Sequence, residues 1–150
     1  MKELASTRLI AHDPDKVFAA AKQVERFPDV LPDLNRVTII EEKGENEVVT
    51  KWEGTINVGP LTRNITWTER DVWDPAARTC TFELIEGDMK EFSGVWTFTP
   101  EDGGCRVDLK IDFELGIPML GPMITRIVDG IMQQNCDGLL EALEKLAAEQ

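Results

Sequence analysis

Three neighbouring charged residues in the segment "RNITWTERDVW", residues 63–73, could take part in acid–base chemistry. Alternate side chains of a β-strand point to opposite faces of a sheet, so Glu69 and Asp71 share one face and Arg70 lies on the other. The apolar residues of the segment have the phase of Glu69, which favours an inward Glu69; the reversed register would point Arg70 inward. A carboxyl group in an apolar cavity has a raised pKa and can act as a general acid or base. Glu69 could equally lie at a cavity mouth, paired with a lysine or arginine.

Other catalytic arrangements find little support in the sequence. His12 is the single histidine, and it stands at a turn between a strand and a helix, where a surface position is the ordinary expectation. A metal site needs several converging nitrogen, sulfur or carboxylate ligands, and no segment has that spacing. No glycine-rich loop follows a strand and opens a helix, as phosphate binding would require. We therefore expect no metal and no cofactor.

The composition is typical of one soluble domain spanning residues 1–150. Hydrophobic residues make up 42% of the chain and charged residues 29%, and the formal net charge is −12. That negative charge disfavours nucleic acid as a partner. No apolar run is long enough for a signal peptide or a membrane span. We therefore expect a cytoplasmic protein without stable membrane insertion, present as a monomer or weak dimer.

The three cysteines, Cys80, Cys105 and Cys136, form no CxxC pair. Each stands in a segment with an apolar period. An odd number of cysteines without a secretion signal indicates reduced thiols in the cytoplasm, and we expect all three to be buried and unpaired.

Short elements with turn signals between them follow one another along the chain. A first strand is expected near residues 4–11, followed by a helix with Asp13 as its N-cap and Pro14 at its first position. Residues 26–34 contain two prolines and predict a turn of helix and a bend. Hairpin-length connections between the next strands favour an antiparallel meander. These six strands are predicted at residues 35–42, 47–56, 63–73, 78–85, 92–99 and 105–115.

The segment "PMLGPMITRIVDGIMQQNCDGLLEALEKL", residues 118–146, predicts one long helix from about residue 120 to 148. Its first apolar stripe gives way to Gln134, Asn135 and Gly138, while a second stripe that includes Cys136 continues on another side. The two amides either face an internal cavity or face solvent. A sheet with one apolar face needs a cover, and this helix is the only large one. The predicted fold is therefore α+β, a helix-grip fold in which a seven-stranded antiparallel sheet wraps around the long C-terminal helix, with two short helices after the first strand.

Four segments together resemble the START-like superfamily: "IAHDPDKVFAAAKQVERFPDVLP", "WTERDVWDPAART", "FSGVWTFTPEDGGCRVDLKIDFEL" and "IPMLGPMITRIVDGIMQQN". The nearest branch is similar to the polyketide cyclase/dehydrase and lipid-transport group, which includes coenzyme Q-binding proteins and aromatase/cyclases. The resemblance implies a deep hydrophobic cavity between helix and sheet. Aromatase/cyclases use an arginine on the strand in this region to polarise a polyketide carbonyl. Here Arg70 is displaced by one residue, which puts its catalytic role in doubt.

The inner faces of the strands and helix supply the candidate ligand contacts, although in such a fold the same residues could be ordinary core. We expect a cavity of the usual drug-binding size, roughly 300–1,000 Å³. The expected function is binding of a lipid, quinone or aromatic polyketide-like molecule as a carrier or chaperone. The alternatives are a polyketide cyclase or aromatase/dehydratase that uses Glu69, Asp71 or Arg70, and an interaction protein with a vestigial pocket. The predicted ligand-binding residues are Trp52, Ile65, Trp67, Glu69, Phe82, Trp96, Phe98, Ile124, Ile127, Gln134 and Asn135.

Overall fold

The structure, a computed structural model, describes residues 2–58, 60–115 and 122–149, without the side chains of residues 58, 61, 122 and 124. Its element order is the predicted one: a strand, two short helices, six strands and a long helix. The elements are β1 (Lys2–Ile10), α1 (Pro14–Lys22), η1 (Val24–Asp29), β2 (Leu34–Glu42), β3 (Glu47–Val58), β4 (Leu61–Asp74), β5 (Thr79–Gly87), β6 (Met89–Glu101), β7 (Gly104–Leu115) and α2 (Pro122–Ala148).

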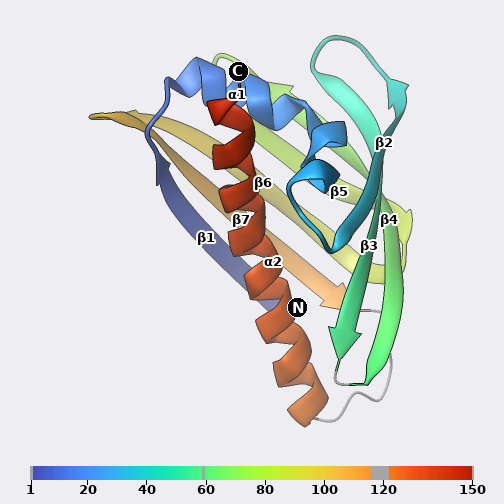
Figure 1. The fold of residues 1–150 in the computed structure, drawn as a ribbon. Helices are drawn as coiled ribbons and strands as arrows, with labels where there is room; N and C mark the ends of the chain where they lie inside the picture. Colours follow the sequence, from blue (N-terminus) through green and yellow to red (C-terminus); the bar gives the residue numbers. More distant parts are fainter. Residues whose placement is uncertain (1, 59, 116–121, 150) are drawn as a thin grey trace.

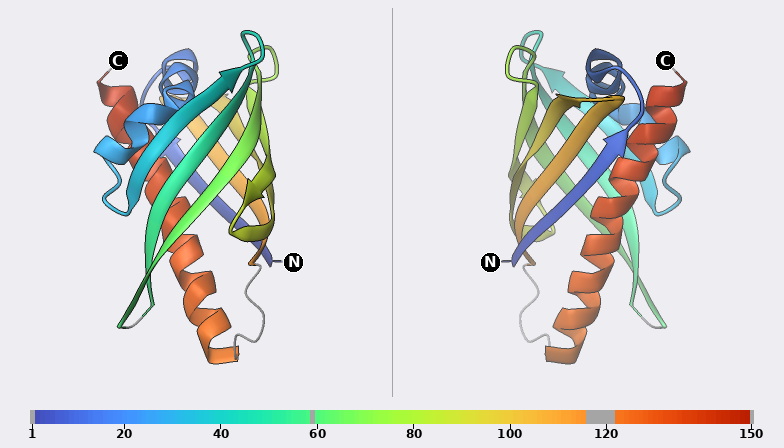
Figure 2. Two further views of the ribbon diagram at one scale, coloured as in Figure 1. Left: turned by 90° about the vertical axis from the view of Figure 1, so that its right-hand side faces the viewer. Right: turned by 90° about the vertical axis from the view of Figure 1, so that its left-hand side faces the viewer.

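The seven strands form one antiparallel sheet in the order β1-β7-β6-β5-β4-β3-β2. Strands β2 to β7 are neighbours in sequence order. Strand β1 is the exception, because it pairs with the last strand, β7, and forms one edge of the sheet. The sheet curves around α2, which lies along its concave face, while α1 and η1 cover one end (Figures 1 and 2). This confirms the predicted helix-grip arrangement. The predicted helix start near residue 120 lies outside the described residues.

The two short helices begin and end where local chemistry requires it. The Asp13 side chain accepts a hydrogen bond from the backbone N–H of Asp15 at 2.8 Å, and Pro14 occupies the first helical position, as predicted. Val17 and Phe18 are buried on the inner face of α1. The following segment forms the 3₁₀ turn η1, which contains Pro28 and packs Phe27 into the core. These elements close the end of the sheet where α2 terminates.

A polar seam joins one side of α2 to strand β1. The Arg8 guanidinium donates to Glu144 at 2.9 Å, and Ser6 donates to Asp137 at 2.6 Å. Nearer the start of the helix, the Gln133 amide donates to a backbone carbonyl of β1 at 3.0 Å. Exposed pairs of this kind contribute little stability one by one, but together they set the rotation of the helix. The opposite side of α2 is left facing β3 and η1.

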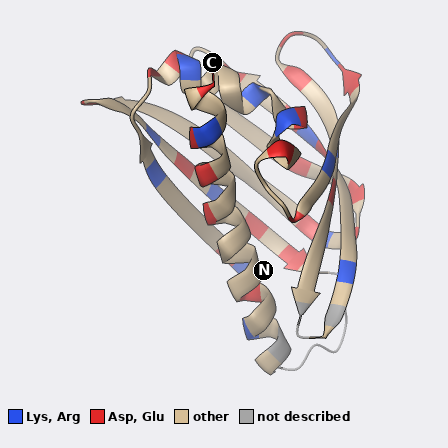
Figure 3. Cartoon of the chain, in the orientation of Figure 1, with Lys and Arg blue, Asp and Glu red and all other residues tan. Residues whose placement is uncertain are grey.

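The second apolar stripe of α2 completes the core at the closed end of the sheet. Cys136, Leu140, Leu143 and Leu146 are all buried there. All three cysteines are buried and unpaired, as predicted. Strand β7 alternates as expected, with its apolar residues inside and its charged residues toward the surface. Charged residues are spread over the strands and along α2 (Figure 3). In the described ranges, no helix is long and apolar enough to cross a membrane.

Candidate functional site

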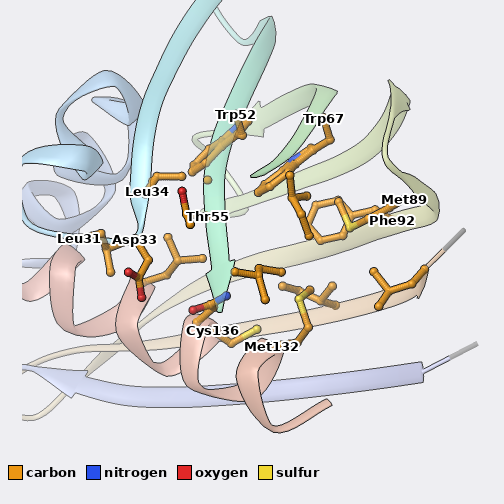
Figure 4. Close-up of a pocket in the computed structure, with 17 residues that line it drawn as sticks. Leu31, Asp33, Leu34, Trp52, Thr55, Trp67, Met89, Phe92, Met132 and Cys136 are labelled. Carbon is orange, nitrogen blue, oxygen red and sulfur yellow. The ribbon is translucent and has the colours of Figure 1, made fainter. Parts of the chain in front are cut away.

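A cavity of about 110 Å³ lies between α2 and the concave face of the sheet. Apolar side chains form most of its lining, with residues 31–34 at one end and strand β6 at the other (Figure 4). The lining residues are Leu31, Asp33, Leu34, Trp52, Gly54, Thr55, Ile56, Ile65, Trp67, Met89, Phe92, Ile111, Leu115, Met132, Asn135, Cys136 and Leu139.

The cavity is smaller than the predicted drug-sized space because large side chains fill the concave face. Its volume is nearer to the roughly 150 Å³ that admits a benzene molecule. Two thioethers, Met89 and Met132, lie on opposite sides of the space. Methionine side chains change rotamer at low cost, so the cavity can enlarge around a ligand.

Two stacked tryptophans form the main wall of the cavity, which we call the tryptophan wall. Trp52 on β3 and Trp67 on β4 are paired in register, with ring centroids 5.8 Å apart and an interplanar angle of 7°. Phe27 continues the aromatic row on one side of the wall and Phe92 on the other. Flat aromatic faces stack well on planar ring systems, so the wall suits an aromatic or quinone-like ligand.

A buried polar network lies behind the tryptophan wall. The indole N–H of Trp67 donates to Glu69 Oε1 at 2.8 Å. The indole N–H of Trp52 donates to Thr50 Oγ1 at 2.9 Å, and the Thr50 hydroxyl donates to Asp71 Oδ2 at 2.8 Å. The indole N–H group of each tryptophan is therefore hydrogen-bonded behind the wall, while other atoms of the ring line the cavity. The network satisfies buried donors that would otherwise cost stability.

Glu69 and Asp71, the carboxyl pair, are 5% and 3% exposed. Burial, and then the charge of Asp71, raise the pKa of Glu69 well above its usual range. Burial also raises the pKa of Asp71, while hydrogen bonds from Glu69 and Thr50 favour its ionised form. Burial therefore favours the protonated form of both carboxyl groups, and most strongly that of Glu69. The pair is buried on the inner face of β4.

The phase of β4 is the one favoured from the sequence. Glu69 and Asp71 point inward with Trp67 and Trp73. Arg70 lies on the opposite face and forms an ion pair with Glu83 of β5. The other arginine of β4, Arg63, shares the inner phase of Trp67 but is exposed near the start of the strand. The structure places Arg70, the second catalytic candidate, on the outer surface of the sheet, away from the cavity.

Four of the predicted ligand-binding residues line the cavity, although whether they contact a ligand stays a prediction. Trp52, Ile65 and Trp67 do so from the sheet, and Asn135 does so from α2. Of the two amides on the helix, Asn135 reaches the cavity and Gln134 faces solvent. Gly138 packs instead against a leucine of the segment between η1 and β2.

Several predicted residues do not line the cavity, contrary to expectation. Glu69 lies behind the tryptophan wall, so it reaches the cavity only through Trp67. Aromatic packing fills the space over the rest: Phe82 contacts Phe92, and Phe98 packs against Phe18 of α1 and stacks on Trp96. The early part of α2 extends past the ends of β1 and β7 (Figure 2), and Ile127 there is 44% exposed. The side chain of Ile124 lies outside the described residues.

The sequence reasoning missed the end of the cavity that residues 31–34, just before and at the start of β2, supply. Leu31, Asp33 and Leu34 come from a proline-containing stretch with no periodic pattern. Phe92 had the correct inner phase and could have been included on that signal. The segment is held because the Asp33 carbonyl accepts a hydrogen bond from the Thr55 backbone N–H at 2.9 Å.

Comparison with known proteins extends the resemblance seen in the sequence. The family described as "Polyketide cyclase / dehydrase and lipid transport" matches residues 10–140. The ribosome association toxin RatA of Vibrio cholerae serotype O1 (El Tor Inaba N16961) is 24% identical over 121 residues, which make up 80% of each chain.

Solved structures share the fold over almost the whole chain. TTHA0849 from Thermus thermophilus has 28% identity and a TM-score of 0.90, covering 99% of this chain and 98% of that one. The Zhui aromatase/cyclase of Streptomyces sp. R1128 has 23% identity and a TM-score of 0.84, covering 98% and 93%. A START superfamily protein from Mycobacterium smegmatis has 15% identity and a TM-score of 0.75, covering 98% and 97%. The narrower assignment to coenzyme Q-binding proteins stays a prediction. With the family match spanning most of its length and the helix-grip fold in place, the chain belongs to the polyketide cyclase/dehydrase and lipid transport family.

Proposed function

We propose that the protein binds a hydrophobic small molecule between the sheet and α2 and acts as its carrier or chaperone in the cytoplasm. The observation that supports this most directly is the cavity lining. It is apolar apart from a few groups at one end, and its principal surface is the tryptophan wall. The ligand class that suits it is a lipid, a quinone or an aromatic polyketide-like molecule, of which one or two rings enter the cavity.

The position of the acid–base groups favours a carrier over an enzyme. A general acid or base must reach the reacting atoms directly or through one water. The carboxyl pair does not line the cavity, and Arg70 faces outward. Among the described residues that line the cavity, Asp33 is the one carboxylate, and it lies at the end opposite Met89 and Phe92 (Figure 4).

A polyketide cyclase or dehydratase is the second candidate, and one observation favours it. Glu69 is a buried acid with a raised pKa, and it is hydrogen-bonded to a cavity-lining indole. Rotation of Trp67 would bring that acid to the cavity. A cyclase that uses Glu69 should lose turnover by a factor on the order of 10²–10⁴ in Glu69→Gln while substrate binding persists. A carrier should keep its ligand affinity within a few-fold in the same variant.

The name of the Vibrio cholerae relatives concerns the ribosome, and it suggests a third role in a larger complex. The net charge of −12 gives no electrostatic support for contact with RNA, which favours basic surfaces. We therefore rank this role below the carrier.

The carrier proposal is tested by blocking the cavity from α2. Naphthalene is the probe, and its binding is measured by calorimetry. Met132 lines the cavity, and Met123 is 76% exposed on the same helix. We expect Met132→Trp to abolish binding, because the indole fills the space, and Met123→Trp to leave it unchanged. Equal binding by both variants would place the probe elsewhere and would count against the proposal.

Native mass spectrometry of protein purified from its own host then identifies the ligand. A co-purifying lipid or quinone that is lost in Met132→Trp would support the carrier role. If naphthalene, quinones and fatty alcohols all fail to raise the melting temperature, the proposal fails, since a site filled at 100 Kd should add about 2.7 kcal/mol of stability.

A further inference from the structure

The charge on the cavity lining is negative only. Among the described residues that line it, Asp33 is the single charged residue and none is a lysine, arginine or histidine. The Cys136 thiol is neutral, since burial raises its pKa to about 12. Two uncharged polar side chains, Thr55 and Asn135, complete the polar part of the lining. The residues that the structure does not describe include no lysine or arginine either.

Asp33 is fixed at the end of the cavity by its own backbone. Its carbonyl accepts the Thr55 N–H at 2.9 Å, and the turn before it closes through the Leu34 N–H to the Leu31 carbonyl at 3.1 Å. Strand β3 can approach this closely because Gly54 has no side chain: a Cβ there would lie 3.2 Å from the Asp33 carbonyl oxygen. Figure 4 shows Asp33 at the same end of the pocket as Leu31 and Leu34.

The Asp33 carboxylate is free to accept a hydrogen bond from a ligand. No hydrogen bond or ion pair joins its side chain to any other described residue. The Asn135 side chain lines the cavity from α2 and offers a second acceptor oxygen. The arginine closest in register to the lining is Arg63, which pairs with Ile56 in the β3–β4 ladder but is exposed and does not line the cavity.

From these placements we infer that the cavity selects ligands whose polar end is a hydrogen-bond donor, neutral or cationic, and rejects ligands that carry a carboxylate there. This inference rests on the proposed function and names the ligand class of the same site. A hydroxyl or ammonium group donates to Asp33 while the apolar body lies against the tryptophan wall. A carboxylate entering the cavity loses hydration, meets Asp33 and finds no lining cation to replace the lost water.

Three probes share the same apolar ring system and differ only in the head group. Comparing them separates the effect of the head group on affinity from that of the apolar body. They are 2-naphthol, 2-naphthylmethylammonium and 2-naphthoate, each titrated into the protein by calorimetry at low salt, with naphthalene as reference. We expect the ammonium and the naphthol to bind at least about tenfold more tightly than the carboxylate, since charge-assisted hydrogen bonds are strong and exposure of Asp33 weakens the effect only in part.

Asp33→Asn removes the charge and keeps the shape, and it should reduce the ammonium-to-carboxylate preference to below about threefold. The matched control is Asp29→Asn, which removes the same charge from the exposed end of η1 and should leave the preference within about twofold. In the unmodified protein the preference should also shrink as salt is raised.

Two results would overturn the inference: 2-naphthoate binding as tightly as the ammonium, or an Asp33→Asn preference equal to that of Asp29→Asn. In both cases naphthalene would still bind, so the apolar site would stand and only its selectivity would be lost. If naphthalene itself does not bind, the proposed function and this inference fail together.

Discussion

The carboxyl pair allows a quantitative test in the Glu69→Gln variant. Glutamine keeps the shape of Glu69 and keeps an oxygen that accepts the indole N–H of Trp67, now seen at 2.8 Å. Its amide can donate to Asp71 in place of the carboxyl proton. The substitution therefore removes one ionisable group from the buried network and leaves the hydrogen bonds in place.

The sign of the effect follows from the raised pKa of Glu69, whose ordinary value is 4.5. Below that pH the group is protonated in both folded and unfolded chains, and the stability it contributes is fully present. Above it the unfolded chain releases the proton while the folded chain retains it, so stability is lost as the pH rises toward the folded pKa. Each pH unit in this window costs about 1.4 kcal/mol for one proton. Between about pH 5 and pH 7, Glu69→Gln should therefore become steadily more stable relative to the parent chain, by up to about 1.4 kcal/mol per pH unit while the folded chain keeps its proton.

The assay is denaturant unfolding of both proteins at half-unit pH steps, followed by tryptophan fluorescence. Taking the difference between the two proteins cancels the titration of the other carboxylates. Glu86→Gln, which removes an exposed carboxylate from β5, measures what the loss of one surface charge does. A flat difference between Glu69→Gln and the parent across this range would refute the reasoning, because Glu69 would then be ionised inside the fold.

Three further predictions follow from the packing. Thr50→Val should destabilise the fold by roughly 1–3 kcal/mol in denaturant unfolding, because Asp71 and an indole N–H lose their shared partner; a change below experimental error would show that water replaces the hydroxyl. Gly94→Ala should cost more than about 2 kcal/mol, since its methyl group would overlap a β7 carbonyl oxygen and a phenylalanine ring, whereas Gly130→Ala on open helix surface should gain up to about 1 kcal/mol. Unfolding curves that rank these two variants in the reverse order would contradict the packing. Cys136 should react with iodoacetamide at pH 8 at least about 100-fold more slowly in the folded than in the unfolded protein, as mass spectrometry of its peptide would show; rapid labelling would mean that α2 opens readily.

The order and type of the strands and helices could be predicted from the sequence, because the segments have regular periods. The alternation in residues 105–115 and the hairpin-length turns define antiparallel strands, because side chains of one face recur every second residue. The capping signals of Asp13 and Pro14 are local, so they are decided by neighbours in sequence. The phase of β4 could be predicted for the same reason, because Glu69 lies an even number of residues from the two tryptophans of the strand and therefore shares their face.

The cavity required the tertiary structure, because its lining depends on where separate elements meet. The α2 sequence permitted more than one rotation; hydrogen bonds from Ser6 and Arg8 on β1 to α2 select the one that turns Asn135 toward the cavity and Gln134 away. Asp33 comes from a segment without a period, and a backbone hydrogen bond to β3 sets its place.

The strand period shows which residues point to the inner face of the sheet. It does not show which of them are packed in the core and which line the cavity. Phe82 and Trp67 share the inner face of the sheet, but neighbouring aromatic rings pack around one and leave part of the other at the cavity. Which side of each strand faces inward could be predicted from the sequence, because side chains of one face recur with a period of two. Which of those inner residues border empty space was decided by packing between elements far apart in the chain, because a cavity is defined by the side chains that fail to meet across it.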